Sequence, residues 1–232
     1  MMRGWARTGA PADSNRVKIE EGAAMTRKGT RQNGIRARIA AAAARIMAED
    51  GIDDFALAKR KAARQVGAED SRVLPANNEI EAELRAYRSL YQAEEHPARI
   101  GELRRIALDA MRALSRFNPY LTGPVLSGLA GRYAAIDLQL FPESAKEVEL
   151  FLLNRNIPYT SLEVRRYSGD QARAVALLTL TWQGAPLKVS VFDPRDERLA
   201  IKTSQAGRVI ERAGLAEVGA LCEASLHGPA QT

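Results

Sequence analysis

Apolar residues recur at helical spacing in the first half of the chain and at alternating spacing in parts of the second half. The helical spacing predicts four helices, at 35–50, 55–66, 78–91 and 97–116. Gly51 and Gly67 follow the first two, where glycine readily takes the left-handed conformation that ends a helix. Asn78, with Glu81 three residues later, has the spacing of a capping box at the start of the third. We therefore predict a helical subdomain over residues 34–116.

Residues 117–226 carry strand and helix signals in turn. The sequence Ala-Ile-Asp-Leu-Gln-Leu at residues 135–140 alternates strictly and predicts a strand with a carboxylate on its polar face. Ser144 with Glu147 predicts the start of a helix that runs to about Asn154. Later segments predict a short strand near 162–164, a hairpin of 174–182 with 186–192, and a closing helix over 205–224 interrupted at Gly214. The expected fold class is α+β, with the helical subdomain followed by a mixed sheet and flanking helices.

The composition is that expected of a soluble globular protein, since 46% of the 232 residues are hydrophobic and 27% are charged. No apolar run reaches the ~18–20 residues of a membrane span, so we expect no membrane partner. The N-terminus has no continuous apolar segment of the kind found in secretory signals. Cys222 is the only cysteine, which excludes an internal disulfide. A cytoplasmic location is the resulting expectation.

The two ends of the chain are predicted to be tails. Residues 1–33 lack hydrophobic periodicity and are expected to be disordered and basic, and residues 227–232 form a short C-terminal tail. Residues 1–38 carry nine Lys or Arg against three acids, and the whole chain has a formal charge of +6. RNA or DNA could therefore bind through the basic N-terminal region. Two alternatives stay open: arginine is simply the preferred surface cation, or Met25 rather than Met1 is the true start.

Residues 120–141 resemble the signature of the nucleotidyltransferase superfamily, the fold of DNA polymerase beta and of small antitoxin-type and tRNA-adding enzymes. That signature places an apolar residue and Gly-Ser about ten residues before Asp-apolar-Asp on a strand. Here Gly123 matches the glycine and Asp137 matches the second acid. Acids two residues apart share one face of a strand and can hold magnesium ions against a nucleotide. The resemblance therefore implies a nucleotidyltransferase-like domain over residues 117–226, a nucleoside triphosphate partner and Mg²⁺ as cofactor.

This chain departs from the signature at the residues that carry the chemistry. Pro124 stands in place of the serine, Ala135 in place of the first acid, and Ser190 where a later strand is expected to supply a third acid. Asp137 is thus the one residue assigned to catalysis and to metal binding, and one carboxylate cannot position two magnesium ions. The groups expected to bind the nucleotide are Gly123, Ser127, Gly128, Arg132, Lys188 and Ser190.

Two further resemblances involve the helical subdomain. The first two predicted helices resemble the opening of a TetR-type DNA-binding domain, with the pattern Ala-Ala-x-x-x-Met-x-Glu-x-Gly and a basic second helix. The sequence after Gly67 shows no tight turn into a recognition helix, so the basic residues also fit a solvated helix face. The span 39–224 resembles an uncharacterised bacterial family of nucleotidyltransferase-like proteins, through Ala-Leu-Ala-Lys-Arg-Lys-Ala-Ala-Arg and Leu-Pro-Ala-Asn-Asn-Glu-Ile-Glu.

Three hypotheses about function follow. The first is a nucleotidyltransferase-type protein, with weakened or lost catalysis unless Asp137 has partner acids that the sequence does not reveal. The second is a non-enzymatic nucleotide- or RNA-binding protein on the same fold. The third is a DNA-binding regulator that uses residues 35–67.

Overall fold

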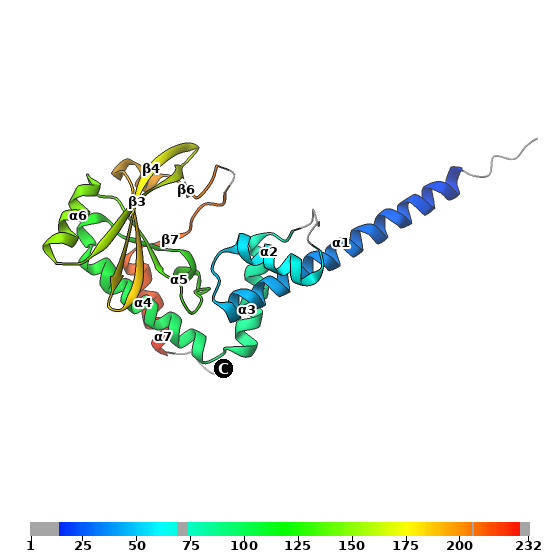
Figure 1. Ribbon diagram of the computed structural model, residues 1–232, viewed down its shortest axis with the longest axis horizontal. Helices are drawn as coiled ribbons and strands as arrows, with labels where there is room; N and C mark the ends of the chain where they lie inside the picture. Colours follow the sequence, from blue (N-terminus) through cyan, green and yellow to red (C-terminus); the bar gives the residue numbers. More distant parts are fainter. Residues whose placement is uncertain (1–13, 69–73, 206, 228–232) are drawn as a thin grey trace, which may run out of the picture.

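The computed structural model describes residues 14–68, 74–205 and 207–227, and within these ranges the side chains are described from Gln32 to Ser225. In this part of the chain, four α-helices precede a mixed β-sheet (Figure 1). The helical part and the sheet stand side by side, and helix α4 runs beneath them from one toward the other (Figure 1). The predicted α+β class, with a helical N-terminal part, is therefore confirmed.

Helix α1 spans Ser14–Asp50, and its N-terminal part projects well beyond the rest of the molecule (Figure 1). The prediction of a disordered tail over residues 1–33 is therefore wrong from Ser14 onward, and residues 1–13 lie outside the described residues. Each residue that is added to the end of an existing helix forms one further backbone hydrogen bond. The segment 14–33 contains no proline, and its two glycines each cost only about 1 kcal/mol relative to alanine.

Helix α2 spans Phe55–Val66, as predicted from the sequence. The Asp54 carboxylate caps its start by accepting hydrogen bonds from the backbone N–H groups of the first turn. Gly67 ends it in the left-handed conformation, with φ of 70°. The buried side of α2 is made of small residues, including Ala58 and Ala62, which allow close packing on α1.

Helix α3 spans Asn77–Tyr91 and begins one residue earlier than predicted. The predicted capping box of Asn78 with Glu81 is wrong. Glu79 instead reaches back and accepts a hydrogen bond from the Ala76 backbone N–H at 2.6 Å. Glu79 also accepts from Arg36 of α1, at 2.6 Å, so the residue that stabilises the start of α3 also joins α3 to α1.

Helix α4 spans Glu95–Ala113 and is followed by the short helix η1, Ser115–Phe117. Pro97 lies in its first turn, where a missing backbone N–H is tolerated. Near its other end, the Asp109 carboxylate accepts hydrogen bonds from the Trp182 indole at 2.9 Å and the Gln183 amide at 2.7 Å. Among the described residues, no helix has both the length and the apolar character needed to cross a membrane.

Seven strands form one sheet within the described residues. They are β1 Tyr120–Thr122, β2 Ile136–Leu140, β3 Tyr159–Ser168, β4 Gln171–Trp182, β5 Ala185–Val191, β6 Ile201–Lys202 and β7 Arg212–Ala213. Their order across the sheet is β6-β3-β4-β5-β2-β1-β7. Strands β2 and β5 are parallel neighbours, and the other pairs are antiparallel. The strand predicted at 135–140 is β2, and the β2–β5 register places Lys188 beside Asp137.

Strands β4 and β5 form the predicted hairpin. Gln183 and Gly184 make its two-residue turn, both with positive φ, as such turns require. Strand β3 is longer than the predicted 162–164, because it pairs along nearly the whole length of β4.

The last helix, α7, spans only Leu215–His227. The prediction of helix over 205–213 is wrong for the described part of that segment. Arg212 and Ala213 form β7 by pairing with the edge of β1, and Val209 bridges to Lys202. The edge of a sheet presents unpaired backbone N–H and C=O groups, and pairing with them can outweigh the local helix propensity of a segment.

The two faces of the sheet have different surroundings. One face is covered by α4, α7 and helix α6 (Ala145–Asn154), and it holds the largest core, which includes Ile136, Leu138 and Val189. The opposite face carries a smaller cluster made of Phe141, Val175, Phe192 and Ile201. Asp137 and Lys188 lie on this second face, because they alternate with the core residues of β2 and β5.

Candidate functional site

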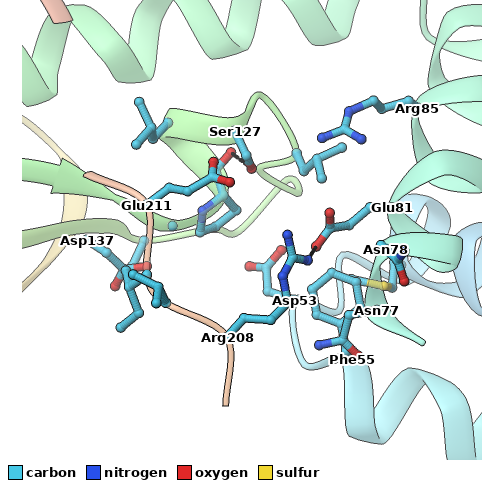
Figure 2. Close-up of a pocket in the computed structure, with 18 of the residues that line it drawn as sticks. Asp53, Phe55, Asn77, Asn78, Glu81, Arg85, Ser127, Asp137, Arg208 and Glu211 are labelled. Atoms are coloured by element: carbon cyan, nitrogen blue, oxygen red, sulfur yellow. Dashed lines mark hydrogen bonds and ion pairs between the residues drawn. The ribbon is translucent and has the colours of Figure 1, made fainter. Parts of the chain in front are cut away.

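A pocket of about 650 Å³ lies between the second face of the sheet and the helical subdomain (Figure 2). Strands β2 and β5 and the short helix α5 (Gly123–Ser127) form one wall, and the end of α1 and the starts of α2 and α3 form the other. Residues 208–211, which precede β7, form a third side. The volume lies within the ~300–1,000 Å³ of small-molecule sites. Both parts of the protein therefore contribute to one cavity.

Gly123 opens α5 directly beside the Asp137 carboxylate. Its φ is +70°, and a Cβ added there would lie 2.6 Å from Asp137 Oδ2. The preceding residue, Thr122, pairs with Asp137 between β1 and β2, and its hydroxyl donates to the Asp137 carbonyl at 3.2 Å. Glycine is thus required here both for its backbone conformation and for the space that it leaves. The glycine and the acid, fourteen residues apart in the sequence, are packed together in the fold.

Helix α5 is held in place by a cation on α4. The Arg104 guanidinium donates to the carbonyls of Val125, at 3.2 Å, and Leu126, at 2.8 Å. These carbonyls lie in the last part of a five-residue helix, where intrahelical partners are lacking. Arg104 therefore fixes the orientation of the element that carries Gly123.

The pKa of Asp137 is raised from its ordinary value of 3.8 to about 6. Burial is the largest cause, and the negative charge of Asp53 adds to it. The charges of Lys188 and Arg166 act in the opposite direction without cancelling the effect of burial. Ionised Asp137 is therefore held at a cost in free energy at neutral pH, and a further cation beside it would favour the ionised form.

Asp53 supplies a second carboxylate to the pocket from the loop between α1 and α2 (Figure 2). Its Oδ1 accepts a hydrogen bond from the Gly131 backbone N–H at 3.3 Å. The pKa of Asp53 is raised because the pocket walls remove water around it, although the Gly131 N–H and the charges of Arg88 and Lys188 lower it. The site thus contains two acids from different subdomains, and the charge of Asp53 raises the pKa of Asp137.

Asp53 is not among the residues predicted to bind a ligand. Its neighbour Asp54 is the N-cap of α2 and accepts from the backbone N–H groups of Ala56, at 2.7 Å, and Leu57, at 3.1 Å. One side chain is enough for this cap, so Asp53 is left to face the pocket. The sequence does contain a signal for Asp53: two consecutive acids stand before a helix that needs only one of them as its N-cap.

Acids outnumber bases among the charged side chains that line the pocket. The carboxylates are Asp53, Glu81, Asp137 and Glu211, and the cations are Arg85, Lys188 and Arg208. Arg208 lies 3.6 Å from Glu81, which joins residues 208–211 to α3. Four carboxylates against three cations leave one negative charge in excess when all are ionised, so a divalent cation bound with a polyphosphate would offset negative charge on both.

Three of the six residues predicted to bind a nucleotide line the pocket. Gly123 and Ser127 are the two ends of α5, and Lys188 stands next to Asp137 on the neighbouring strand. The Ser127 hydroxyl donates to the Pro124 carbonyl at 3.4 Å. The structure therefore brings these three residues together with the predicted acid.

The other three predicted residues, Gly128, Arg132 and Ser190, are not among the residues that line the pocket. Gly128 ends α5 in the left-handed conformation. The Arg132 guanidinium lies over the Tyr133 ring, 5.8 Å from its centre. Ser190 is two residues beyond Lys188 on β5, so it shares the face of the sheet but lies farther along the strand. The sheet domain therefore contributes fewer of the predicted residues to the pocket, and the rest of the lining comes from the helical subdomain and residues 208–211.

Two of the basic residues of α2, Lys59 and Lys61, have partners within the helical subdomain. Lys59 donates to the Asn77 carboxamide oxygen at 2.8 Å, and Lys61 lies 3.4 Å from the Asp50 carboxylate. These contacts tie α2 to α3 and α1. The segment 69–73, where a recognition turn would fall, lies outside the described residues, so the predicted absence of such a turn stays a prediction.

Comparison with known proteins finds no match to a protein-family model, a curated protein or a solved structure. Inferences about function therefore depend on the chemistry of the pocket. Within the described residues, no cluster of three or more His, Cys, Asp or Glu side chains is placed to hold a metal ion. Asp53 and Asp137 both line the pocket, from the helical subdomain and from the sheet.

Proposed function

We propose that the pocket binds a nucleoside triphosphate as its magnesium complex, and that the protein is nucleotidyltransferase-like, with nucleotidyl transfer weakened or lost. The observation that carries this proposal is that Asp53 and Asp137 line one pocket and that the charge of Asp53 raises the pKa of Asp137. A cation between two such carboxylates relieves their repulsion. Mg²⁺ is commonly bound by one or two carboxylates together with substrate phosphates.

The sheet wall of the pocket supports phosphate binding. Lys188 offers a point charge beside Asp137, and Ser127 offers a hydroxyl at the end of α5. Gly123 has no side chain, so a ligand can approach its backbone closely. Bound Mg²⁺ would neutralise part of the phosphate charge. Without it, the excess of acids in the pocket disfavours the binding of phosphate.

The small number of acids on the sheet also supports weakened or lost nucleotidyl transfer. Two-metal transfer relies on several carboxylates that hold a pair of ions in fixed positions. Ala135 and Ser190 occupy the positions where the family resemblance places two of these acids. Asp53 replaces neither of them on the sheet, because it comes from the helical subdomain. One ion held by two acids is sufficient for binding, but it leaves the second metal of the reaction without ligands.

The binding proposal is tested by thermal unfolding of the purified full-length chain with ATP, GTP, CTP or UTP, each with and without Mg²⁺. We expect at least one nucleotide to raise the Tm only when Mg²⁺ is present, since a ligand stabilises the folded state by RT ln(1 + [L]/Kd). Asp137→Asn and Asp53→Asn should each remove the dependence on Mg²⁺. If no nucleotide shifts the Tm at millimolar concentration, the proposal is wrong; an equal shift without Mg²⁺ would remove the metal from it.

Transfer itself is measured separately. The protein is incubated with a nucleotide labelled at the α-phosphate, Mg²⁺ and total RNA, and label on RNA or on the protein is counted. We expect label to accumulate slowly or not at all, and any label to be absent with Asp137→Asn. Rapid labelling in the wild type would contradict the proposed loss of activity.

A second candidate, nucleic-acid binding through the N-terminal region, is supported by the projection of α1 from the body of the protein (Figure 1). Residues 14–33 carry five Lys or Arg and two Glu. A projecting basic helix can lie along a phosphate backbone, with affinity that falls as salt rises. The test is RNA and DNA binding at several salt concentrations, with and without residues 1–33. Binding that survives the deletion would refute this role.

A further inference from the structure

We propose that the helical subdomain is the base-recognition half of the pocket and that it selects a purine nucleoside triphosphate. This inference rests on the proposed function. The two walls of the pocket differ in chemistry: the sheet wall presents Asp137 and Lys188, whereas the helical wall presents an aromatic ring, two carboxamides and a carboxylate. Bases are recognised in proteins by stacking on aromatic side chains and by hydrogen bonds to their edges.

Phe55 provides the stacking surface. It is the first residue of α2, and its half-buried ring packs against the core of the helical subdomain while lining the pocket. Its neighbour in the wall, Met47, is only 3% exposed and belongs to the same core. A ring that is fixed from behind loses little conformational freedom when a base stacks on it. Figure 2 shows Phe55 on the side of the pocket opposite to Asp137.

Asn77, Asn78 and Glu81 provide hydrogen-bonding groups beside that ring. They lie in the first turns of α3, and Figure 2 shows both carboxamides close to Phe55. Lys59 donates to the Asn77 carboxamide oxygen at 2.8 Å, which leaves the Asn77 amide nitrogen as a donor. Asparagine can pair with the N6 and N7 atoms of adenine, and a carboxylate can accept from an exocyclic amino group.

The preference for a purine follows from these groups. Only purines have the N7 acceptor beside a second polar group on their outer edge, and their two fused rings offer more surface to stack on Phe55. With the base against the helical wall, the triphosphate extends toward Lys188 and the two acids. The base therefore adds contacts with Phe55, Asn77 and Asn78 that an inorganic polyphosphate lacks.

The test compares dissociation constants for ATP, GTP, CTP, UTP and inorganic tripolyphosphate, all with Mg²⁺, measured by calorimetry on the full-length chain. The test variant is Phe55→Leu, which keeps an apolar side chain against the core and removes the aromatic face. Leu57→Ala is the matched control, because Leu57 lies on the same helix, is 36% exposed and is not among the pocket residues. The Tm of each free variant checks that the fold is retained.

We expect ATP or GTP to bind the wild type at least fivefold more tightly than UTP and tripolyphosphate. Phe55→Leu should weaken the purine nucleotide by about 5- to 100-fold and leave tripolyphosphate within twofold. The inference is overturned if UTP or tripolyphosphate binds as tightly as ATP and GTP, or if Phe55→Leu leaves the affinity for purine nucleotides unchanged. Absence of binding by all five ligands would refute the nucleotide site as a whole, which separates that failure from failure of base recognition.

Discussion

The backbone of Gly123 lies so close to the Asp137 carboxylate that a Cβ on Gly123 would be 2.6 Å from Oδ2. Real Cβ atoms essentially never approach so closely. The start of α5 therefore packs directly against the acid of β2, and a side chain at position 123 would displace the carboxylate. The approach also places a bare segment of backbone beside the acid that lines the pocket.

Gly123→Ala should lower stability and displace Asp137. The new methyl group would clash with the carboxylate, and a φ of +70° adds strain of about 1 kcal/mol for a residue with a side chain. Gly169→Ala is a suitable control, because Gly169 has a φ of +61° but nothing within 4 Å of an added Cβ. Urea unfolding should show a larger loss for Gly123→Ala than for Gly169→Ala. Equal losses would mean that backbone strain alone matters and that the contact with Asp137 does not.

Asp137→Asn should stabilise the protein at neutral pH. The pKa of Asp137 is about 6 in the folded state and 3.8 in its ordinary state, so the folded state holds the proton more tightly. The stability contributed by protonated Asp137 is full below pH 4 and is lost as pH rises through 6. At pH 7.5 the ionised carboxylate lowers the free energy of unfolding by up to about 3 kcal/mol.

This effect is measured by urea unfolding of the wild type and Asp137→Asn at pH 4 and pH 7.5. The variant should be more stable at pH 7.5, and the difference should vanish near pH 4. Asp170→Asn serves as the control, because the Asp170 side chain is 90% exposed. The stability difference between this variant and the wild type should be nearly the same at pH 4 and pH 7.5. A variant less stable than the wild type at pH 7.5 would show that the ionised carboxylate has favourable partners.

Local patterns in the sequence predicted elements whose partners are close along the chain. The bounds of α2, the strand that carries Asp137 and the β4–β5 hairpin all follow from spacing, capping or turn residues. Predictions failed where a distant partner decides the outcome. Residues 212–213 form a strand because β1 offers a free edge, and Glu79 rather than Glu81 caps α3 while it binds Arg36.

The candidate site was predictable in the same limited way. Gly123, Ser127, Lys188 and Asp137 belong to the sheet domain and were found through the motif and the alternation of strand residues. The helical wall was missed because it is brought to the pocket by the packing of two subdomains. Asp53 is 84 residues from Asp137 in the sequence, and no local pattern relates them.

Asp53→Asn should lower the pKa of Asp137. The charge of Asp53 is one cause of the raised pKa, and burial is a larger one, so the value should fall below about 6 but stay above 3.8. The measurement is the pH at which the stability difference between the wild type and the Asp137→Asn variant develops, determined with and without Asp53→Asn in both proteins. That midpoint should move to lower pH.

The matched control is the neighbouring acid. Asp54→Ala should cost about 1 kcal/mol of stability through loss of the helix cap, while leaving the pKa of Asp137 in place. If Asp53→Asn does not move the midpoint, the two carboxylates do not interact, and the shared magnesium site loses its main support.

Arg88→Met should raise the pKa of His96. Burial lowers this pKa most, and the charge of Arg88, which is itself only 5% exposed, lowers it further. Removing the guanidinium should therefore move the pKa upward, but it should stay below 6.5 because burial remains. Proton NMR of the imidazole resonances measures the shift, with His96→Gln to identify the signal. Arg85→Met, three residues earlier on the same helix, is the control, because the charge of Arg85 is not among the causes of the lowered pKa of His96.

The result would also show how the pocket is held together. His96 Nε2 lies 3.2 Å from the Ala130 carbonyl and must carry a proton in that hydrogen bond, because a carbonyl only accepts. Asp53 binds the next residue, Gly131, and the charge of Arg88 acts on both His96 and Asp53. The loop that leads into β2 is thus joined to the helical subdomain by the hydrogen bonds of His96 and Asp53. If the pKa of His96 falls or does not change in Arg88→Met, the charge of Arg88 does not lower the pKa of this histidine.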